Sequence, residues 1–192
     1  DFSVENTMDG AFYNAGQSCC AVERIYVERP IYDRFVEAFV EKTRAYRLGD
    51  PMDAATSIGP LAAKGQPAFL AGQVADAVAR GGRLVVDPAS FDTPKQGWFY
   101  APAVVADAPQ DSALMAEESF GPVIGILPVS GDEEAVRLMN DSPYGLTASI
   151  WTSDPARAAR VGARVETGTF FMNRCDFLDP ALPWTGVKDT GR

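Results

Sequence analysis

Short runs of β-branched and aromatic residues alternate along the chain with longer stretches that repeat apolar residues at helical spacing. The runs that favour strands lie at residues 22–27, 84–86, 103–105, 123–129, 147–151 and 169–173. The stretches that favour helices lie at residues 30–46, 65–80 and 133–140. A fourth helix is expected to start at residues 153–155 and to end before Gly168. Strands that alternate with helices favour parallel pairing, because each helix crosses one face of the sheet to reach the next strand. The sequence therefore predicts an α/β fold with a mostly parallel sheet and helices on its faces.

Local signals support these boundaries. Pro30 and Pro155 suit the first turns of helices, Gly81 suits a left-handed helix end, and Asp132 is placed to cap the helix that follows it. The opening residues 1–7 are polar, the stretch 87–102 is expected to form a surface loop, and the tail 174–192 is expected to be irregular. No internal repeat or low-complexity segment divides the chain. We therefore expect residues 1–192 to form a single domain.

The composition excludes several classes of protein. Of 192 residues, 46% are hydrophobic and 22% are charged, so the chain can bury enough apolar surface to fold. A formal net charge of −9 disfavours binding to nucleic acid or to anionic membrane surfaces, because both carry negative charge. No apolar run is long enough to span a bilayer, and no signal-peptide pattern opens the sequence. We expect a cytoplasmic protein.

The chain holds three cysteines and no histidine. An odd number of cysteines without regular spacing does not suit a disulfide scaffold, so a reducing compartment is expected. The absence of histidine removes Cys-His and Ser-His pairs and histidine-based metal sites, and no metal is expected. A cysteine hydrolase is disfavoured for the same reason. Catalysis within this chain must use a cysteine, carboxylates or a cofactor.

Cys19 is the most informative cysteine. Gly16 allows the backbone to turn closely just before it, and a thiolate on such a turn at a cleft can attack a carbonyl. Most free cysteines, however, are small buried residues, so this turn alone leaves both readings open. Cys20 and Cys175 are expected to be packing residues.

The residues around Cys19 decide between the two readings. They resemble the active-site signature of the aldehyde dehydrogenase family, an aromatic pair followed by Asn-x-Gly-Gln-x-Cys. The matching string is Phe12-Tyr13-Asn14-Ala15-Gly16-Gln17-Ser18-Cys19. The resemblance implies that Cys19 is the nucleophile and makes Tyr13 a candidate for the substrate pocket.

A second segment, residues 117–123, resembles the family's Glu-Glu-x-Phe-Gly-Pro motif. By itself it reads as a solvated loop that enters a strand. The resemblance implies that Glu118 accepts hydrogen bonds from the ribose hydroxyls of NAD or NADP and that Phe120 lies near the nicotinamide. A carboxylate suits the first role, because it can accept from both hydroxyls of a diol.

Two further segments extend the resemblance over essentially the whole chain. Residues 140–152 resemble the family's Asn-x-x-x-Tyr/Phe-Gly-Leu stretch, which we interpret as structural. Residues 183–191 resemble its Pro-Phe-Gly-Gly-x-Lys-x-Ser-Gly motif and place Trp184 where an aromatic residue lines the substrate tunnel. Thr185 and Thr190 depart from that motif, which affects the expected shape of the aldehyde pocket.

The resemblance implies an oxidoreductase that converts an aldehyde to a carboxylic acid with NAD or NADP. In that family the cysteine thiolate forms a thiohemiacetal, hydride transfer leaves a thioester, and water releases the acid. Parts of the family pattern are not found in these residues. They are the Glu-Leu-Gly-Gly motif with its general base, an oxyanion-hole Asn, the cofactor-binding domain and the C-terminal oligomerisation tail. We therefore expect a catalytic domain that is weakly active or inactive by itself, from a protein that forms a homodimer or homotetramer.

Two alternatives stay open. One is an acylating relative, in which coenzyme A rather than water takes the acyl group. The other is a non-catalytic domain that keeps the fold for scaffolding, which the presence of Cys19 and Glu118 disfavours.

Overall fold

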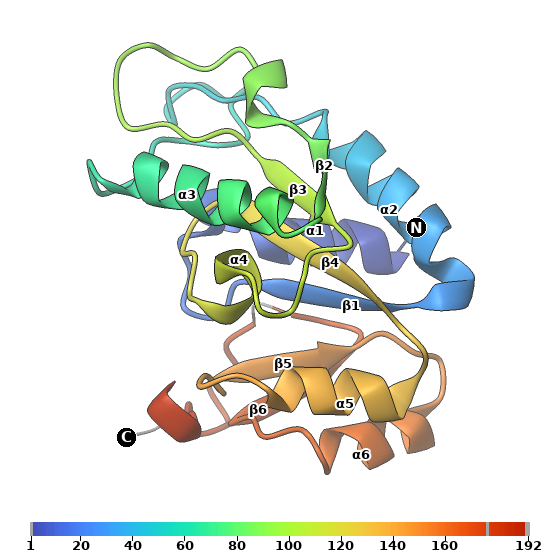
Figure 1. Ribbon diagram of the computed structural model, residues 1–192. Helices are drawn as coiled ribbons and strands as arrows, with labels where there is room; N and C mark the ends of the chain where they lie inside the picture. Colours follow the sequence, from blue (N-terminus) through green and yellow to red (C-terminus); the bar gives the residue numbers. More distant parts are fainter. Residues whose placement is uncertain (1, 176, 191–192) are drawn as a thin grey trace.

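A four-stranded sheet forms the centre of the fold in the computed structural model, which describes residues 2–175 and 177–190 (Figure 1). Its strand order is β1-β4-β3-β2. The strands are β1 (Arg24–Glu28), β2 (Arg83–Val86), β3 (Ala103–Ala106) and β4 (Val123–Val129). β1, β4 and β3 pair in parallel, whereas β2 pairs with β3 in the antiparallel direction at one edge. The mostly parallel sheet predicted from the sequence is confirmed.

Helices cover both faces of this sheet (Figure 1). One face carries α1 (Phe2–Phe12) and α2 (Arg29–Thr43), which pack against each other. The opposite face carries α3 (Gln66–Ala79) and the short α4 (Ala113–Ala116). β3 is buried along its whole length and β4 along most of it, as expected for central strands covered on both sides.

Two parallel strands form a second, smaller sheet, β5 (Thr147–Ile150) and β6 (Thr169–Met172). It is accompanied by α5 (Asp132–Asn140) and α6 (Pro155–Gly162), and the short turns η1 (Tyr13–Gly16), η2 (Pro88–Ser90) and η3 (Lys188–Thr190) complete the elements. Arg24 at the start of β1 donates to Ser142 before β5, and Glu28 at the end of β1 pairs with Arg157 after β5. β1 and β5 therefore run in the same direction on facing edges of the two sheets.

The structure differs from the sequence analysis in three places. The opening residues, for which no element was predicted, form helix α1, and its buried face is made largely of small residues that give a weak periodic signal. The strands divide into two sheets rather than one. Asp132 does not cap α5, whose N-cap is Gly131 with φ 147°, because its carboxylate binds Arg157 instead. Asp154, in contrast, caps α6 by accepting from two backbone N–H groups.

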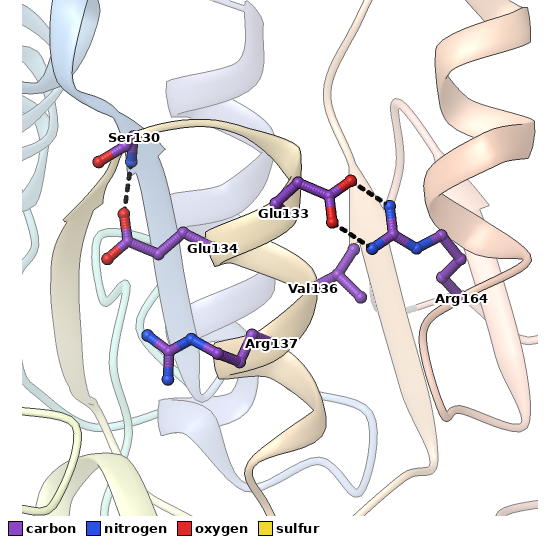
Figure 2. A pocket seen from close by; sticks show the side chains of 6 residues that line it. All are labelled: Ser130, Glu133, Glu134, Val136, Arg137 and Arg164. Atoms are coloured by element: carbon purple, nitrogen blue, oxygen red, sulfur yellow. Dashed lines mark hydrogen bonds and ion pairs between the residues drawn. The ribbon is translucent and has the colours of Figure 1, made fainter.

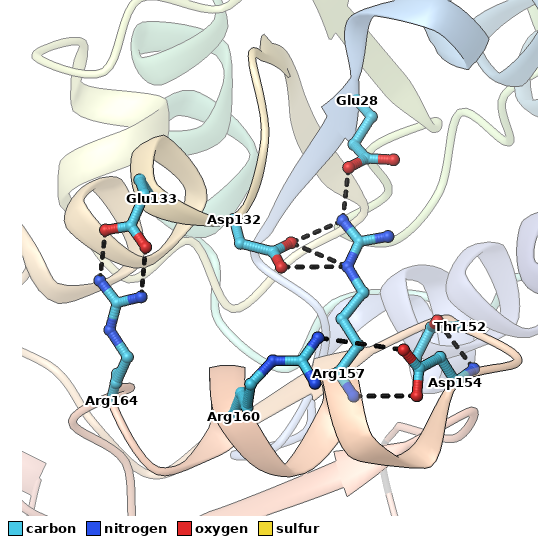
Figure 3. Close-up of polar contacts among 8 residues, drawn as sticks. All are labelled: Glu28, Asp132, Glu133, Thr152, Asp154, Arg157, Arg160 and Arg164. Carbon is cyan, nitrogen blue, oxygen red and sulfur yellow. Dashed lines mark hydrogen bonds and ion pairs between the residues drawn. The ribbon is translucent and has the colours of Figure 1, made fainter.

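Arg157 joins three elements, as Figure 3 shows. Its guanidinium on α6 pairs with Asp132 on α5 and with Glu28 at the end of β1. The hydrogen bond from Arg157 is the main cause that lowers the pKa of the Asp132 carboxyl. The arginine thus attaches the smaller sheet and its helices to the larger one.

We predict that Arg157→Met destabilises the fold by about 1–2 kcal/mol at neutral pH, the lower part of the range for bonds between charged groups because these carboxylates are partly exposed. A carboxyl whose pKa is lower in the folded than in the unfolded chain stabilises the fold above its ordinary pKa, and that contribution disappears as the pH falls through the lowered value. The stability difference between wild type and variant should therefore shrink in strong acid.

Urea unfolding followed across a pH series measures this difference. Arg160→Met is the matched control, because Arg160 lies on the same helix, is mostly exposed and approaches Asp154 only at 3.9 Å. An equal loss of stability in both variants would contradict the role assigned to Arg157.

Candidate functional site

The topology brings two of the predicted segments together. The segment that carries Cys19 leads into β1, and the segment that carries Glu118 leads into β4. β1 and β4 are parallel neighbours, with Arg24 opposite Gly125. Segments that precede adjacent parallel strands lie at the same end of the sheet, so Cys19 and Glu118 reach one place although about a hundred residues separate them in sequence.

A tight turn aims the Cys19 segment. α1 ends at Phe12, and the next residues wind through left-handed backbone, with φ of 51° at Asn14, 57° at Ala15 and 71° at Gly16. The Asn14 side chain donates to the Gln17 carbonyl at 3.1 Å, and the Gln17 N–H donates to the Asn14 carbonyl at 3.2 Å. The Gln17 side-chain amide also donates to the Asn14 carbonyl at 3.1 Å, so three hydrogen bonds stabilise a backbone conformation that residues other than glycine seldom adopt.

Gly16 lies directly against the second segment. A Cβ atom at this position would stand 2.2 Å from the carbonyl oxygen of Gly121, far inside contact distance. Only glycine allows the two backbones to approach so closely. This contact is the structural reason for the glycine in the first motif.

Gln17 fixes the turn to a third part of the chain. Its Oε1 accepts from the Ala62 N–H at 2.8 Å, and its Nε2 donates to the Pro60 carbonyl at 3.5 Å. The turn is therefore held on both sides, by residues 60–62 and by Gly121.

The three thiols have different surroundings. Cys19 is exposed, whereas Cys20 is buried and Cys175 is half-buried. The Cys175 thiol donates to the carbonyl of Asn6 at 3.3 Å and packs against Gly10 of α1. Exposure and position thus distinguish Cys19 from the two cysteines that were expected to be packing residues.

Cys19 and Glu118 line the same cavity, of about 350 Å³, which lies between β1 and β5. Glu118 is exposed, and its carboxylate makes no hydrogen bond or ion pair with any other described residue. Within the described chain the Cys19 N–H also makes no hydrogen bond. The cavity therefore offers a thiol, a free carboxylate and a backbone donor.

The segment around Glu118 is held from two sides. Gln66 at the start of α3 donates to the Ser119 carbonyl at 2.6 Å and to the Phe120 carbonyl at 3.4 Å. Glu23 accepts from the Ser119 N–H at 3.0 Å and from the Phe120 N–H at 3.2 Å. Burial raises the pKa of the Glu23 carboxyl, and the two backbone donors oppose that shift.

The structure does not place the predicted aromatic residues in this cavity. Phe120 and Trp184 are each 38% exposed and Tyr13 is 61% exposed, and none of the three lines the cavity walls. The motif that contains Trp184 packs instead against the stretch 140–145. Lys188 donates to the carbonyls of Asn140 and Ser142 there. Gly191, the last residue of that motif, lies outside the described residues.

A second hollow, of about 630 Å³, lies on the outer side of α5 (Figure 2). Two of its acids already have partners, since Glu133 pairs with Arg164 and Glu134 accepts from the Ser130 N–H. It contains no cysteine, so it is not the candidate site. No helix among residues 2–175 and 177–190 is long and apolar enough to cross a membrane. The same residues include no group of three or more acids or cysteines placed to hold a metal ion.

Sequence reasoning missed the side chains that hold the site together. Gln17 lies inside the recognised motif, but its contact with residues 60–62 depends on the fold. Gln66 carries no chemical signal of its own. The one signal for Glu23 is its place, an acidic residue directly before a strand that is buried at alternate positions.

The whole chain matches a known family. The model of the aldehyde dehydrogenase family covers residues 1–192. A succinate-semialdehyde dehydrogenase (NADP+) of Mycobacterium avium is 40% identical over 191 residues, which span all of this chain and 40% of that protein. The chain therefore spans about two fifths of the length of the curated relatives it matches.

Solved structures agree with this match. An aldehyde dehydrogenase of Mycobacterium tuberculosis complexed with NAD+ is 34% identical, with a TM-score of 0.91 over all of this chain and 39% of that one. Aldehyde dehydrogenase 21 of Physcomitrella patens, in complex with the reaction product succinate, is 32% identical, with a TM-score of 0.91 over all of this chain and 39% of its own. The shared fold and the match over every residue show that this chain belongs to the aldehyde dehydrogenase family.

Proposed function

We propose that residues 1–192 form the cysteine-bearing catalytic domain of an NAD(P)-dependent aldehyde dehydrogenase, with Cys19 as the nucleophile. The observation that carries this proposal is that the exposed Cys19 thiol and the Glu118 carboxylate, which has no partner among the described residues, line the same cavity. Family membership supports the reaction class. The names of related proteins, which include NADP+ and a complex with NAD+, support the cofactor class.

The residues at the cavity fit such a cofactor. The Glu118 carboxylate is exposed at the cavity and has no partner among the described residues, so its oxygens are available to accept from the two hydroxyls of a ribose. Glu118 is proposed to hold the ribose, and the exposed ring of Phe120 is proposed to offer an apolar surface to the nicotinamide. When bound, the cofactor accepts a hydride.

Cys19 is proposed to supply the covalent chemistry. Its thiolate attacks the aldehyde carbon, so that a sulfur–carbon bond forms and the carbonyl oxygen becomes an oxyanion. The free Cys19 N–H is a suitable donor to that oxyanion. Loss of the hydride from the same carbon leaves a thioester on Cys19, and hydrolysis of the thioester releases the acid and restores the thiol.

The roles of Tyr13 and Trp184, the substrate and the oligomeric state stay predictions. Tyr13 and Trp184 are exposed aromatic residues outside the cavity, and we propose that they contribute to the outer part of the aldehyde site. The substrate is proposed to be a small aldehyde, with succinate semialdehyde the first candidate because relatives carry that name. A homodimer or homotetramer is proposed for the protein as its gene encodes it.

We predict that limited treatment with iodoacetamide labels Cys19 before Cys20 and Cys175. Only an exposed thiolate reacts quickly, and Cys20 and Cys175 are buried or half-buried. Peptide mapping by mass spectrometry after short exposures measures the order. Preferential labelling of Cys175 would argue against Cys19 as the nucleophile.

We predict that Cys19→Ser, in the protein as its gene encodes it, lowers aldehyde oxidation by roughly 10³-fold or more, because the variant lacks the group that forms the covalent intermediate. The assay follows NADH or NADPH absorbance with a panel of aldehydes, with and without coenzyme A. Cys175→Ser is the control and should retain activity. Failure of the wild type to oxidise any aldehyde in the panel would refute the proposed function, and a strict requirement for coenzyme A would assign the acylating reaction.

A further inference from the structure

The Glu23 carboxylate connects the two segments of the candidate site. It lies four residues after Cys19 and just before β1. One of its oxygens accepts from the Ser119 N–H at 3.0 Å, and the other accepts from the Phe120 N–H at 3.2 Å. Each oxygen thus has its own donor, and both donors come from the segment that directly follows Glu118.

The backbone that Glu23 binds has an unusual conformation. Phe120 has a φ of 50°, in the left-handed region that aromatic residues seldom adopt. Such a conformation persists only where several contacts hold it. In this conformation two successive N–H groups converge on one anion, an arrangement that favours a bound negative charge.

The carboxylate has no ion-pair partner of its own. Among the described residues no lysine or arginine forms a salt bridge with Glu23. The charge of Arg24 lowers the pKa of the Glu23 carboxyl less than each of the two backbone donors does. Partial burial of an acid is unfavourable unless its oxygens are hydrogen-bonded. The backbone N–H groups of residues 119 and 120 are therefore the groups that make an acid acceptable at this position.

Gln66 holds the same two peptides from the opposite side, through the carbonyls of Ser119 and Phe120. Glu23 and Gln66 differ, however, in what they connect. Gln66 attaches the segment to α3, whereas Glu23 attaches it to the strand that follows Cys19. Of these two side chains, only Glu23 attaches residues 119 and 120 to the strand that follows the thiol.

We infer that Glu23 is a positioning residue, which holds Glu118 and Phe120 at a fixed place relative to Cys19 and so sets the affinity of the site for the nicotinamide cofactor. This inference rests on the proposed function. Glu23 does not take part in bond formation. It acts through the backbone of residues 119 and 120.

The test is Glu23→Gln in the protein as its gene encodes it. Glutamine keeps the size of the side chain but can accept from only one N–H, and its amide nitrogen then faces the other donor. Because a bond to a charged acceptor is lost, the KM for NAD or NADP should rise about tenfold, with a smaller change in kcat at saturating cofactor. The rate of Cys19 alkylation should stay within about twofold, since the turn at Gly16 and Gln17 fixes the thiol.

Glu37→Gln is the matched control, because Glu37 is an exposed acid on α2 without a hydrogen-bond partner among the described residues. It should leave both KM and kcat unchanged. Glu23→Ala should raise the cofactor KM further than Glu23→Gln, provided that thermal melting shows a folded protein at the assay temperature. Glu23→Gln remains the deciding variant if the alanine variant unfolds.

Three outcomes distinguish the claims. A raised cofactor KM with a largely retained kcat supports the inference. An active wild type with an unchanged cofactor KM in Glu23→Gln overturns this inference alone. A fall in kcat together with a fall in melting temperature, without a change in KM, also overturns it and indicates a purely structural role. An inactive wild type overturns the proposed function and this inference with it.

Discussion

The close approach of Gly16 to Gly121 is the constraint on which the candidate site depends. A side chain at position 16 would overlap the Gly121 carbonyl, and the φ of 71° at Gly16 is itself unfavourable for other residues. The contact joins the end of one motif to the middle of another. It explains in physical terms why a glycine precedes the cysteine by three positions, whereas a Cβ at Gly121 would overlap the Leu70 side chain of α3.

The sheet makes this contact possible. β1 and β4 are parallel neighbours, and each is preceded by one of the two segments. Hydrogen bonds from three side chains then fix the two segments in place. Gln17 attaches the turn to residues 60–62, while Gln66 and Glu23 hold residues 119 and 120. An exposed thiol and a carboxylate with no partner among the described residues therefore line one cavity, and no hydrogen bond joins them.

The sequence was informative where local chemistry decides structure. The buried run at β4 was predicted at its observed bounds. Gly81, predicted to end a helix, lies just after the end of α3 and has a φ of 109°. α1 was missed because its buried face is formed by Thr7, Gly10 and Ala11 among others, which give little hydrophobic contrast. Asp132 had the right residue type for a cap, but the Arg157 guanidinium binds it more strongly. The split into two sheets depends on which strand edges meet, and no local pattern encodes that.

Hydrogen exchange of residues 14–21 and 117–122 in Gly16→Ala tests the central claim most directly. If the Gly16–Gly121 contact holds both segments, the variant should exchange faster in both and remain protected in β3 and β4. Gly72→Ala is the matched control, because Gly72 lies on α3 with nothing within 4 Å of an added Cβ, and it should leave both segments unchanged. Unchanged exchange at residues 117–122 in Gly16→Ala would contradict the account.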